Sequence, residues 1–335
     1  MSLDRNPSPT AEVDAVDDGR IEGTVYSKGS ALKALLLFAK LSESGAAVEE
    51  TASVTELDAD AERILCQFWD MTVDKNVCEY LLSCQPQALR AIADALVTNG
   101  HRPRLTEICA GVLANACEFE CLCRGLDPQL IRMVFAAFLE SADTATLVQL
   151  LRLFAVVREQ GHWMSSGWQE CFEDMDCARK LWLVLSSSTN AELLGDSALF
   201  CEYLFTVGGS SQLSKTFFET APGSFDCLFE ALEESLKVGH LTAASGSLLR
   251  ILHDCTTDET KLAALGRCEA RLLVALDGCA DLVSGADQSE AGDSDTLLFV
   301  RCIREILQSF GDLWPTERVE DIHGKLMLCA TQKLT

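Results

Sequence analysis

Four cysteines lie close together in the sequence and are the residues best placed to do chemistry. They are Cys109, Cys117, Cys121 and Cys123, separated by seven, three and one residues. A structural zinc site needs four thiolates or imidazoles that converge tetrahedrally, usually from paired C-x2-C units. This spacing supplies no such pair, so we expect buried thiols and neither a metal nor a cofactor. A cysteine-based redox or metal-responsive site is the alternative, which metal analysis of the purified protein would test.

The sequence carries no signature of a catalytic nucleophile or of a phosphate-binding loop. It has no G-x-S-x-G nucleophile elbow and no H-E-x-x-H zinc motif. The segment 23–28 begins with glycine, but Lys28 is followed by Gly29, so the Gly-Lys-Ser/Thr end of a phosphate loop is missing. We therefore expect the protein not to be an enzyme.

The strong acidity of the chain disfavours nucleic acids and anionic membranes as partners. Its 335 residues include 51 Asp and Glu against 27 Lys and Arg, which gives a formal net charge of -24. Such a surface repels phosphate backbones and anionic lipid headgroups, and the basic residues are scattered along the chain. We expect the partners to be other proteins, with no binding of nucleic acid or membranes.

Residues 1–27 are predicted to form a flexible acidic tail. Acidic residues and two prolines occupy its first part without an apolar stretch, so it does not resemble a secretory signal peptide. The protein is therefore expected not to be secreted, and its 16 cysteines to be reduced, as in the cytosol or nucleus. Ser8, between two prolines in the tail, fits a proline-directed phosphorylation site whose added charge would alter the docking of a partner.

Almost every segment after the tail has the apolar spacing of a helix, and no segment alternates as a strand does. Pro103 is predicted to open one helix, and Asp143 to cap another that ends at Arg158. The second of these is apolar on nearly all sides, which predicts a helix packed against several neighbours. The fold class is therefore all-α, with an acidic loop at residues 284–296.

A recurring glycine favours a helical repeat over a compact bundle. Gly111, Gly195 and Gly246 each precede an apolar helical stretch, at separations of 84 and 51 residues. These separations are near two and one units of the ~40–47-residue armadillo or HEAT period. A glycine inside a helix costs stability, so each is expected to serve close helix packing. The prediction is an armadillo/HEAT-like α-solenoid over residues 28–335, whose long concave face suits partner binding.

The segment Ile108–Cys117 resembles the third helix of an armadillo repeat. The resemblance implies that Asn115 lines the concave groove and hydrogen-bonds an extended peptide, since an amide offers both a donor and an acceptor. Glu107 lies two turns earlier, near the same helix face, where its carboxylate would hold a partner's Lys or Arg. The alternative is that Asn115 is structural and caps the helix or satisfies a neighbouring backbone group.

Two tryptophans are predicted to be partly exposed. Trp163 and Trp168 lie in and beside the glycine-flanked stretch 161–167, and tryptophan is common among interface hot spots. Trp69 follows Phe68 in a helical pattern and is instead predicted to belong to the core.

Six short blocks resemble the serum amyloid A-like family. They keep order and rough spacing across residues 4–194: Asp4–Pro9, Thr24–Lys28, Thr55–Asp58, Trp69–Met71, Pro103–Cys109 and Ser186–Asn190. The resemblance implies an armadillo-like, non-enzymatic nuclear protein associated with promoting cell proliferation, and not the secreted acute-phase amyloid protein. After Lys28 the family continues with an aromatic-rich segment, whereas here Gly29–Ala31 follow, and no block matches beyond residue 194.

These observations together predict a non-enzymatic α-solenoid scaffold that binds other proteins, located in the nucleus with the cytoplasm as a second location. One alternative is an adaptor or transport-type receptor that captures basic peptides along an acidic groove. Affinity for Lys/Arg-rich peptides that falls steeply with salt would favour this receptor over a general scaffold. The cysteine-based regulator remains the other alternative.

Overall fold

The computed structural model shows that the chain is all-helical over the residues it describes, which confirms the predicted all-α class. One isolated bridge joins Arg20 and Ser27, and no strand is found in the described ranges. The described residues are 19–45, 55–84, 87–124, 126–161, 167–206, 218, 223–285, 293–310, 314 and 316–333. The chain divides into two compact units, residues 1–122 and 123–335.

The folded part of the first unit begins earlier than predicted. Residues 19–27 form a turn in which the Ile21 amide donates to the Tyr26 carbonyl at 2.9 Å. The Ile21 side chain is only 2% exposed, so the turn is packed against the helices. The predicted tail boundary at residue 27 is therefore wrong, because residues 19–27 are structured. Ser8 lies outside the described residues.

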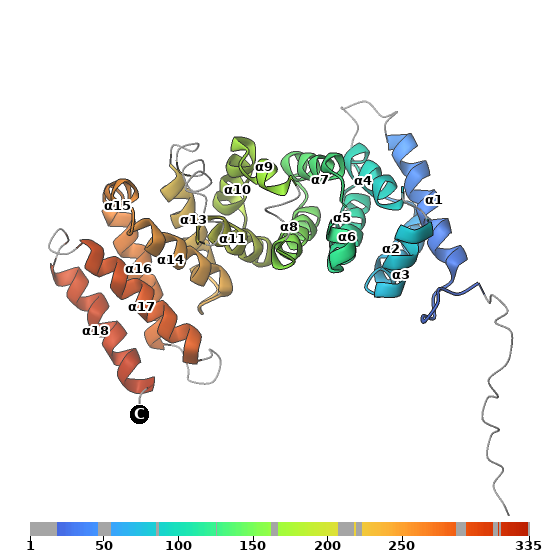
Figure 1. Cartoon of the computed structure of the whole chain (residues 1–335). Coiled ribbons are helices and arrows are strands. Elements are labelled where there is room, and N and C mark those ends of the chain that lie inside the picture. The colour runs from blue at the N-terminus through green and yellow to red at the C-terminus, as the bar shows by residue number, and fades with distance from the viewer. Residues whose placement is uncertain are drawn as a thin grey trace, which may run out of the picture. The chain divides into compact units, whose positions relative to one another are not determined.

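The first unit is a cluster of helices (Figure 1), and most of its buried side chains are apolar, such as Phe38, Phe68 and Ile108. Its helices are α1 (Lys28–Gly45), α2 (Ala59–Met71), α3 (Lys75–Cys84), α4 (Ala88–Thr98), α5 (Pro103–Cys117) and α6 (Glu120–Arg124), the last of which crosses the boundary between the units. Helix α1 packs against α2 and α4, and α5 packs against the same two helices. The sequence sets these elements locally: the Asp58 side chain caps α2, and Pro103 opens α5 as predicted.

The second unit is also built of helices over its described residues. They are α7 (Pro128–Glu140), α8 (Thr144–Glu159), α9 (Trp168–Phe172), α10 (Met175–Ser187), α11 (Ala191–Thr206), α13 (Ser224–Leu236), α14 (Ala243–Cys255), α15 (Glu259–Gly266), α16 (Glu269–Gly285), α17 (Asp293–Phe310) and α18 (Thr316–Lys333). The predicted cap at Asp143 is confirmed, since its carboxylate accepts from the Thr146 amide at 2.8 Å. The two ends of the predicted loop 284–296 are helical, because α16 runs to Gly285 and α17 begins at Asp293.

Two rows of helices organise the second unit. In one row, which we call the α8–α17 row, α8 contacts α11, α11 contacts α14 and α14 contacts α17. In the other row α10, α13, α16 and α18 follow one another in the same way. Helices adjacent in the chain link the rows, as in the pairs α10–α11 and α13–α14. Each helix pair therefore packs on the pair before it. Helix α8, the first of its row, buries nine residues and keeps a polar side that includes Gln149 and Arg152.

An aromatic cluster fills the core beside α8, and it contains Trp168. The ring centroid of Phe154 lies 5.8 Å from that of Trp168 and 5.3 Å from that of Phe172. The Trp168 side chain is 0% exposed. The predicted partial exposure of Trp168 is therefore wrong, because α9 directs the ring into the core. Trp163 lies outside the described residues.

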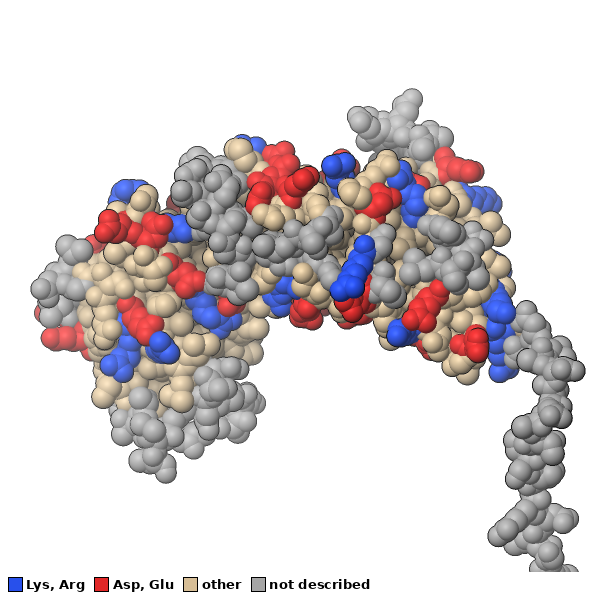
Figure 2. Space-filling view, in the orientation of Figure 1, with Lys and Arg blue, Asp and Glu red and all other residues tan. Residues whose placement is uncertain are grey.

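No helix in the described part of the chain is both long and apolar enough to pass through a membrane. Positive and negative side chains are mixed over the face drawn in Figure 2, where the described lysines and arginines form no single patch.

Candidate interaction surface

Polar side chains connect the successive helices of the α8–α17 row. Between Ala244 and Cys255 of α14, only Arg250, His253 and Asp254 are not fully buried. Arg250 reaches the neighbouring helix α11, where its Nε lies 2.5 Å from Glu202 Oε1 and its Nη2 lies 2.8 Å from Glu202 Oε2. A half-buried bidentate pair of this kind is among the stronger charge-assisted hydrogen bonds.

The same pattern continues to the helices on either side. His253 Nε2 of α14 lies 2.7 Å from Glu305 Oε2 of α17, and Arg301 Nε donates to Glu305 Oε1 at 2.8 Å. The hydrogen bond from Arg301 holds the pKa of Glu305 below its ordinary value. In the other direction, the Arg158 guanidinium of α8 lies 4.9 Å from the ring centroid of Tyr203 on α11. We call these linked side chains the charge ladder of the row.

A groove of about 270 Å³ lies between α8 and α11. Its α11 wall carries Glu192 and Asp196, one helical turn apart, and neither has a hydrogen-bond or ion-pair partner among the described residues. Burial, with the charge of Glu192, raises the pKa of the Asp196 carboxyl. The α8 wall carries arginines that already have partners: Arg152 donates to Gln149 at 3.2 Å, and Arg158 lies 3.3 Å from the Glu159 carboxylate.

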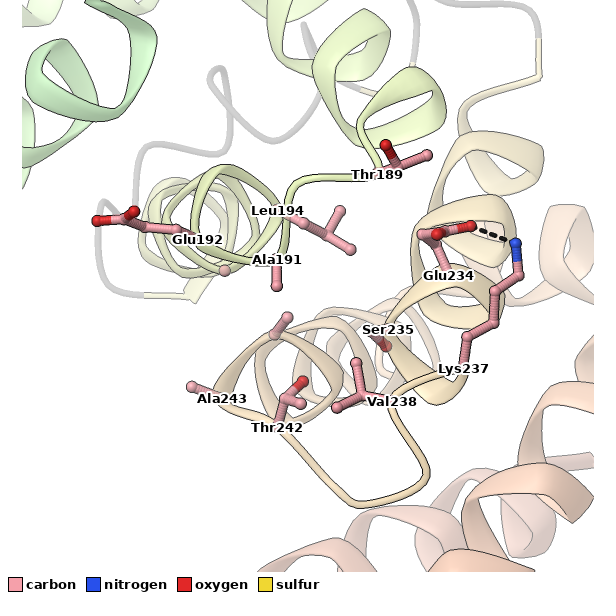
Figure 3. Close-up of a pocket in the computed structure, with 12 residues that line it drawn as sticks. Thr189, Ala191, Glu192, Leu194, Glu234, Ser235, Lys237, Val238, Thr242 and Ala243 are labelled. Carbon is pink, nitrogen blue, oxygen red and sulfur yellow. Dashed lines mark hydrogen bonds and ion pairs between the residues drawn. The ribbon is translucent and has the colours of Figure 1, made fainter. Parts of the chain in front are cut away.

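A second cavity, of about 440 Å³, lies between the start of α11, the end of α13 and the start of α14. We call it the slot. Figure 3 shows Ala191 and Leu194 of α11 on one side and Val238 and Ala243 on the other. Glu192 belongs to the lining of both cavities, and in Figure 3 its carboxylate points away from the slot, across α11.

The glycine predicted to serve close packing in α11 instead opens the slot. A Cβ added at Gly195 would meet no described atom within 4 Å. At Gly111 an added Cβ would lie 2.2 Å from Trp69 Cζ2, and at Gly246 it would lie 3.1 Å from Phe299 Cζ. The close-packing prediction therefore holds at two of the three positions and is wrong at Gly195.

The structure places Asn115 inside the first unit. Its side chain is 3% exposed, and its Nδ2 donates to the Trp69 carbonyl and to Thr72 Oγ1, each at 3.2 Å. Asn115 thereby ties α5 to the end of α2. The groove role predicted for Asn115 is therefore wrong. The alternative, that Asn115 satisfies a neighbouring backbone group, matches its contact with the Trp69 carbonyl.

Glu107 is half-buried and does not act with Asn115. Its Oε2 lies 2.6 Å from Arg104 Nη1, and the same arginine donates from Nε to Glu62 Oε1 at 2.7 Å. Arg104 thus bridges α5 and α2, and the carboxylate that we assigned to a partner's cation already has a cation within its own unit.

Replacing Asn115 by alanine is expected to lower the free energy of unfolding by about 1–2 kcal/mol, because two buried hydrogen bonds are lost. Asn115→Asp should cost more at neutral pH, since it replaces the donor by a carboxylate that faces the Trp69 carbonyl. Urea unfolding followed by far-UV circular dichroism measures both. Unchanged stability in Asn115→Ala would contradict the structural role.

The cysteines are mainly core residues. Of those with described side chains, ten are buried and four are half-buried. In the group 109–123, Cys109, Cys117 and Cys123 are buried, whereas the side chain of Cys121 lies outside the described residues. The described residues contain no group of three or more His, Cys, Asp or Glu side chains arranged to hold a metal ion.

Thiol reactivity should follow this burial. Burial raises the pKa of Cys255 and Cys279 to about 12, and it raises the pKa of half-buried Cys66 to a smaller extent. A raised pKa lowers the thiolate fraction at a given pH, so alkylation should be slow at pH 8 and faster as the pH rises. Mass spectrometry after timed alkylation is expected to show modification first at the half-buried thiols: Cys66, Cys171, Cys227 and Cys268. Rapid labelling of Cys109 or Cys177 in the folded protein would contradict this order.

Sequence reasoning did not find the charge ladder or the slot. A signal for the ladder was present, because Glu202 and Arg250 are 48 residues apart, close to the expected repeat period. The sequence offers no comparable signal for the slot. The slot exists because ends of α11, α13 and α14 lie next to one another, and that arrangement depends on tertiary packing.

Comparison with known proteins supports the resemblance found in the short blocks. No protein-family model matches the chain. The chain is 32% identical to Protein saal1 of Danio rerio over 234 residues, which are 67% of this chain and 48% of that protein. It is 29% identical to Protein saal1 of Xenopus tropicalis over 227 residues and 28% identical to Protein SAAL1 of Homo sapiens over 204 residues.

The chain spans about half the length of these curated relatives, 48% of the first two and 42% of the human protein. The predicted resemblance is thereby confirmed: over about two thirds of its length, this chain is homologous to the SAAL1 proteins of the serum amyloid A-like family.

Proposed function

We propose that the protein is a non-enzymatic α-solenoid scaffold that binds other proteins through the α8–α17 row. The observation that carries this proposal is the serial packing of α8, α11, α14 and α17, each against the next. Serial packing is the mark of repeat proteins, in which each repeat contacts only its neighbours and the stack presents an extended surface.

The chemistry of the row supports a binding role. Two of its half-buried polar groups are held by partners on neighbouring helices: Arg250 by Glu202 and His253 by Glu305. Such a surface is rigid before a partner arrives, which reduces the ordering cost of association. Beside the ladder, the groove and the slot offer places where side chains of a partner would fit.

The shifted pKa values of the described groups have structural causes. Burial raises the pKa of thiols within the core, such as Cys177 and Cys201, and hydrogen-bonded ion pairs shift groups such as Glu305 and Lys325. Ten of the fourteen described thiols are buried. Their burial argues against these ten as redox sensors, because redox sensing needs an accessible thiolate. These causes also support a role in binding over one in catalysis.

The family resemblance supports a nuclear location, with the cytoplasm as a second one, and a link to cell proliferation. Both are proposals for this chain. Microscopy of the full chain fused to a fluorescent protein tests the location. Depletion of the endogenous protein, followed by cell counts with and without re-expression, tests the link to proliferation.

A displayed library of protein segments, screened against the full chain, tests the scaffold role. We expect enriched segments that bind saturably and slow amide hydrogen exchange in helices of the α8–α17 row. A library without any saturating segment, or protection confined to the first unit, would contradict the proposal.

A further inference from the structure

We propose that the slot takes one bulky apolar side chain of a partner segment, and that Glu192 and Asp196 bind a Lys or Arg of the same segment. This inference rests on the proposed scaffold function and names the chemistry of the bound segment. Of the two binding roles considered from the sequence, the proposal favours a receptor for basic segments over a general scaffold. It adds the requirement that the bound segment also carries an apolar side chain.

The lining of the slot is suited to an apolar anchor. Its volume of about 440 Å³ lies within the range of about 300–1,000 Å³ that is usual for ligand pockets. Ala191 and Leu194 of α11, Val238 just after α13, and Ala243 and Ala244 of α14 give its wall an apolar part. Figure 3 labels four of these side chains around the cavity. Val238 is 49% exposed at the mouth, so an entering side chain would cover apolar surface that now faces water.

The space in the slot depends on Gly195. At Gly111 and at Gly246 an aromatic ring from a neighbouring helix packs against the glycine. At Gly195 no described atom lies within 4 Å of an added Cβ. Glycine in the middle of a helix lowers stability relative to alanine. At Gly195 no packing contact offsets that cost, which is the pattern expected if the empty volume serves a ligand.

The charges next to the slot specify a cation in the bound segment. Glu192 lines the slot and directs its carboxylate across α11 to the groove, where Asp196 lies one turn further along. Neither carboxylate has a partner in the described part of the chain, whereas Arg152 and Arg158 on the opposite wall do. At the other rim of the slot, Glu234 is already paired with Lys237. A segment that crosses the first turn of α11 would therefore meet the slot and then two carboxylates that no described residue pairs with.

Two glycine variants separate occupancy of the slot from stability of the fold. Gly195→Leu would fill the slot with the protein's own side chain, while the helix gains a better helix former. Gly324→Leu is the matched control, because Gly324 lies within α18 and a Cβ there also meets no atom of the described residues within 4 Å. Both variants of the full chain should keep the melting temperature of the parent or exceed it.

The probes are fluorescein-labelled 12-residue peptides with a single Leu, Phe or Trp and a Lys-Arg pair at varied distances from it. Matched peptides carry Ser in place of the apolar residue, or Glu in place of the basic pair. Anisotropy titrations with the parent chain should give saturable binding that needs both features and weakens as salt rises. Gly195→Leu should weaken binding by about tenfold or more, and Gly324→Leu should leave it unchanged. The double variant Glu192→Gln/Asp196→Asn should reduce both affinity and salt dependence.

The outcomes distinguish this inference from the scaffold role. If Gly195→Leu, folded and stable, binds the probe peptides as the parent does, the slot assignment is wrong while the scaffold stands. Saturable binding of library segments together with failure of every probe peptide overturns the segment chemistry and again leaves the scaffold. If neither library segments nor probe peptides bind, both proposals fail.

Discussion

Replacing Gly111 by alanine is expected to destabilise the first unit by about 3 kcal/mol, at the upper end of the usual cost of overpacking. The added Cβ would lie 2.2 Å from Cε2 and from Cζ2 of the Trp69 ring. A rigid ring cannot yield at one atom, so α2 and α5 must separate or the indole must leave its position. The gain in helix propensity, about 1 kcal/mol from glycine to alanine, offsets only part of this cost.

Gly195→Ala is the matched control for this prediction. It makes the same chemical change inside a helix where the added methyl group meets nothing within 4 Å in the described part of the chain, so it should stabilise the second unit slightly. Urea unfolding gives the change in free energy, and amide hydrogen exchange in α2 and α5 assigns it to the first unit. Equal effects of the two substitutions would show that the Trp69 contact is not the cause.

A double-mutant cycle identifies the ring as the partner of Gly111. Trp69→Leu should itself be destabilising, because it removes contact area between α2 and α5. In that background Gly111→Ala should cost much less than in the parent, since the close contact is gone. A coupling free energy of about 0.5–3 kcal/mol is usual for residues in direct contact. Additive effects would mean that the two residues do not meet.

At the three glycines, the sequence predicted the helices correctly but not the residues that pack against them. Gly111, Gly195 and Gly246 share a local pattern, a glycine followed by an apolar helical stretch, and the pattern placed all three in helices correctly. What covers each glycine comes from another helix: Trp69 at Gly111, Phe299 at Gly246 and no described residue at Gly195. Sequence periodicity describes one helix at a time, so it could not separate a packing glycine from one that opens a cavity.

Because sequence patterns describe one helix at a time, they predicted helix ends correctly but not the role of Asn115. Pro103 and Asp143 act on the backbone within their own helices, and both predictions are confirmed. The groove role of Asn115 required knowing what α5 packs against. Its amide instead meets the Trp69 carbonyl at the end of α2, more than forty positions earlier in the chain. Local rules therefore predicted the elements, while the contacts that give residues their roles came from tertiary packing.

Trp168 gives the second large expected effect, and the prediction reverses our expectation from the sequence. An exposed interface tryptophan could be truncated with a change in stability within about 0.5 kcal/mol. Trp168 is 0% exposed and packs against Phe154 and Phe172. Trp168→Ala should therefore lower the free energy of unfolding of the second unit by about 3–5 kcal/mol.

A conservative variant tests which property of Trp168 matters. Its Nε1 is buried without a hydrogen-bond partner in the described structure. Trp168→Phe therefore loses no hydrogen bond and removes a polar group whose burial is unfavourable, so it should cost less than half as much as Trp168→Ala. The control is Leu183→Ala on α10, which truncates a side chain that is 58% exposed and should change stability little. Chemical denaturation of the full chain, with hydrogen exchange in α8 and α10, measures all three variants. If Trp168→Ala behaves like Leu183→Ala, Trp168 is not a core residue; if Trp168→Phe is as damaging as Trp168→Ala, the indole N–H has a partner within the fold.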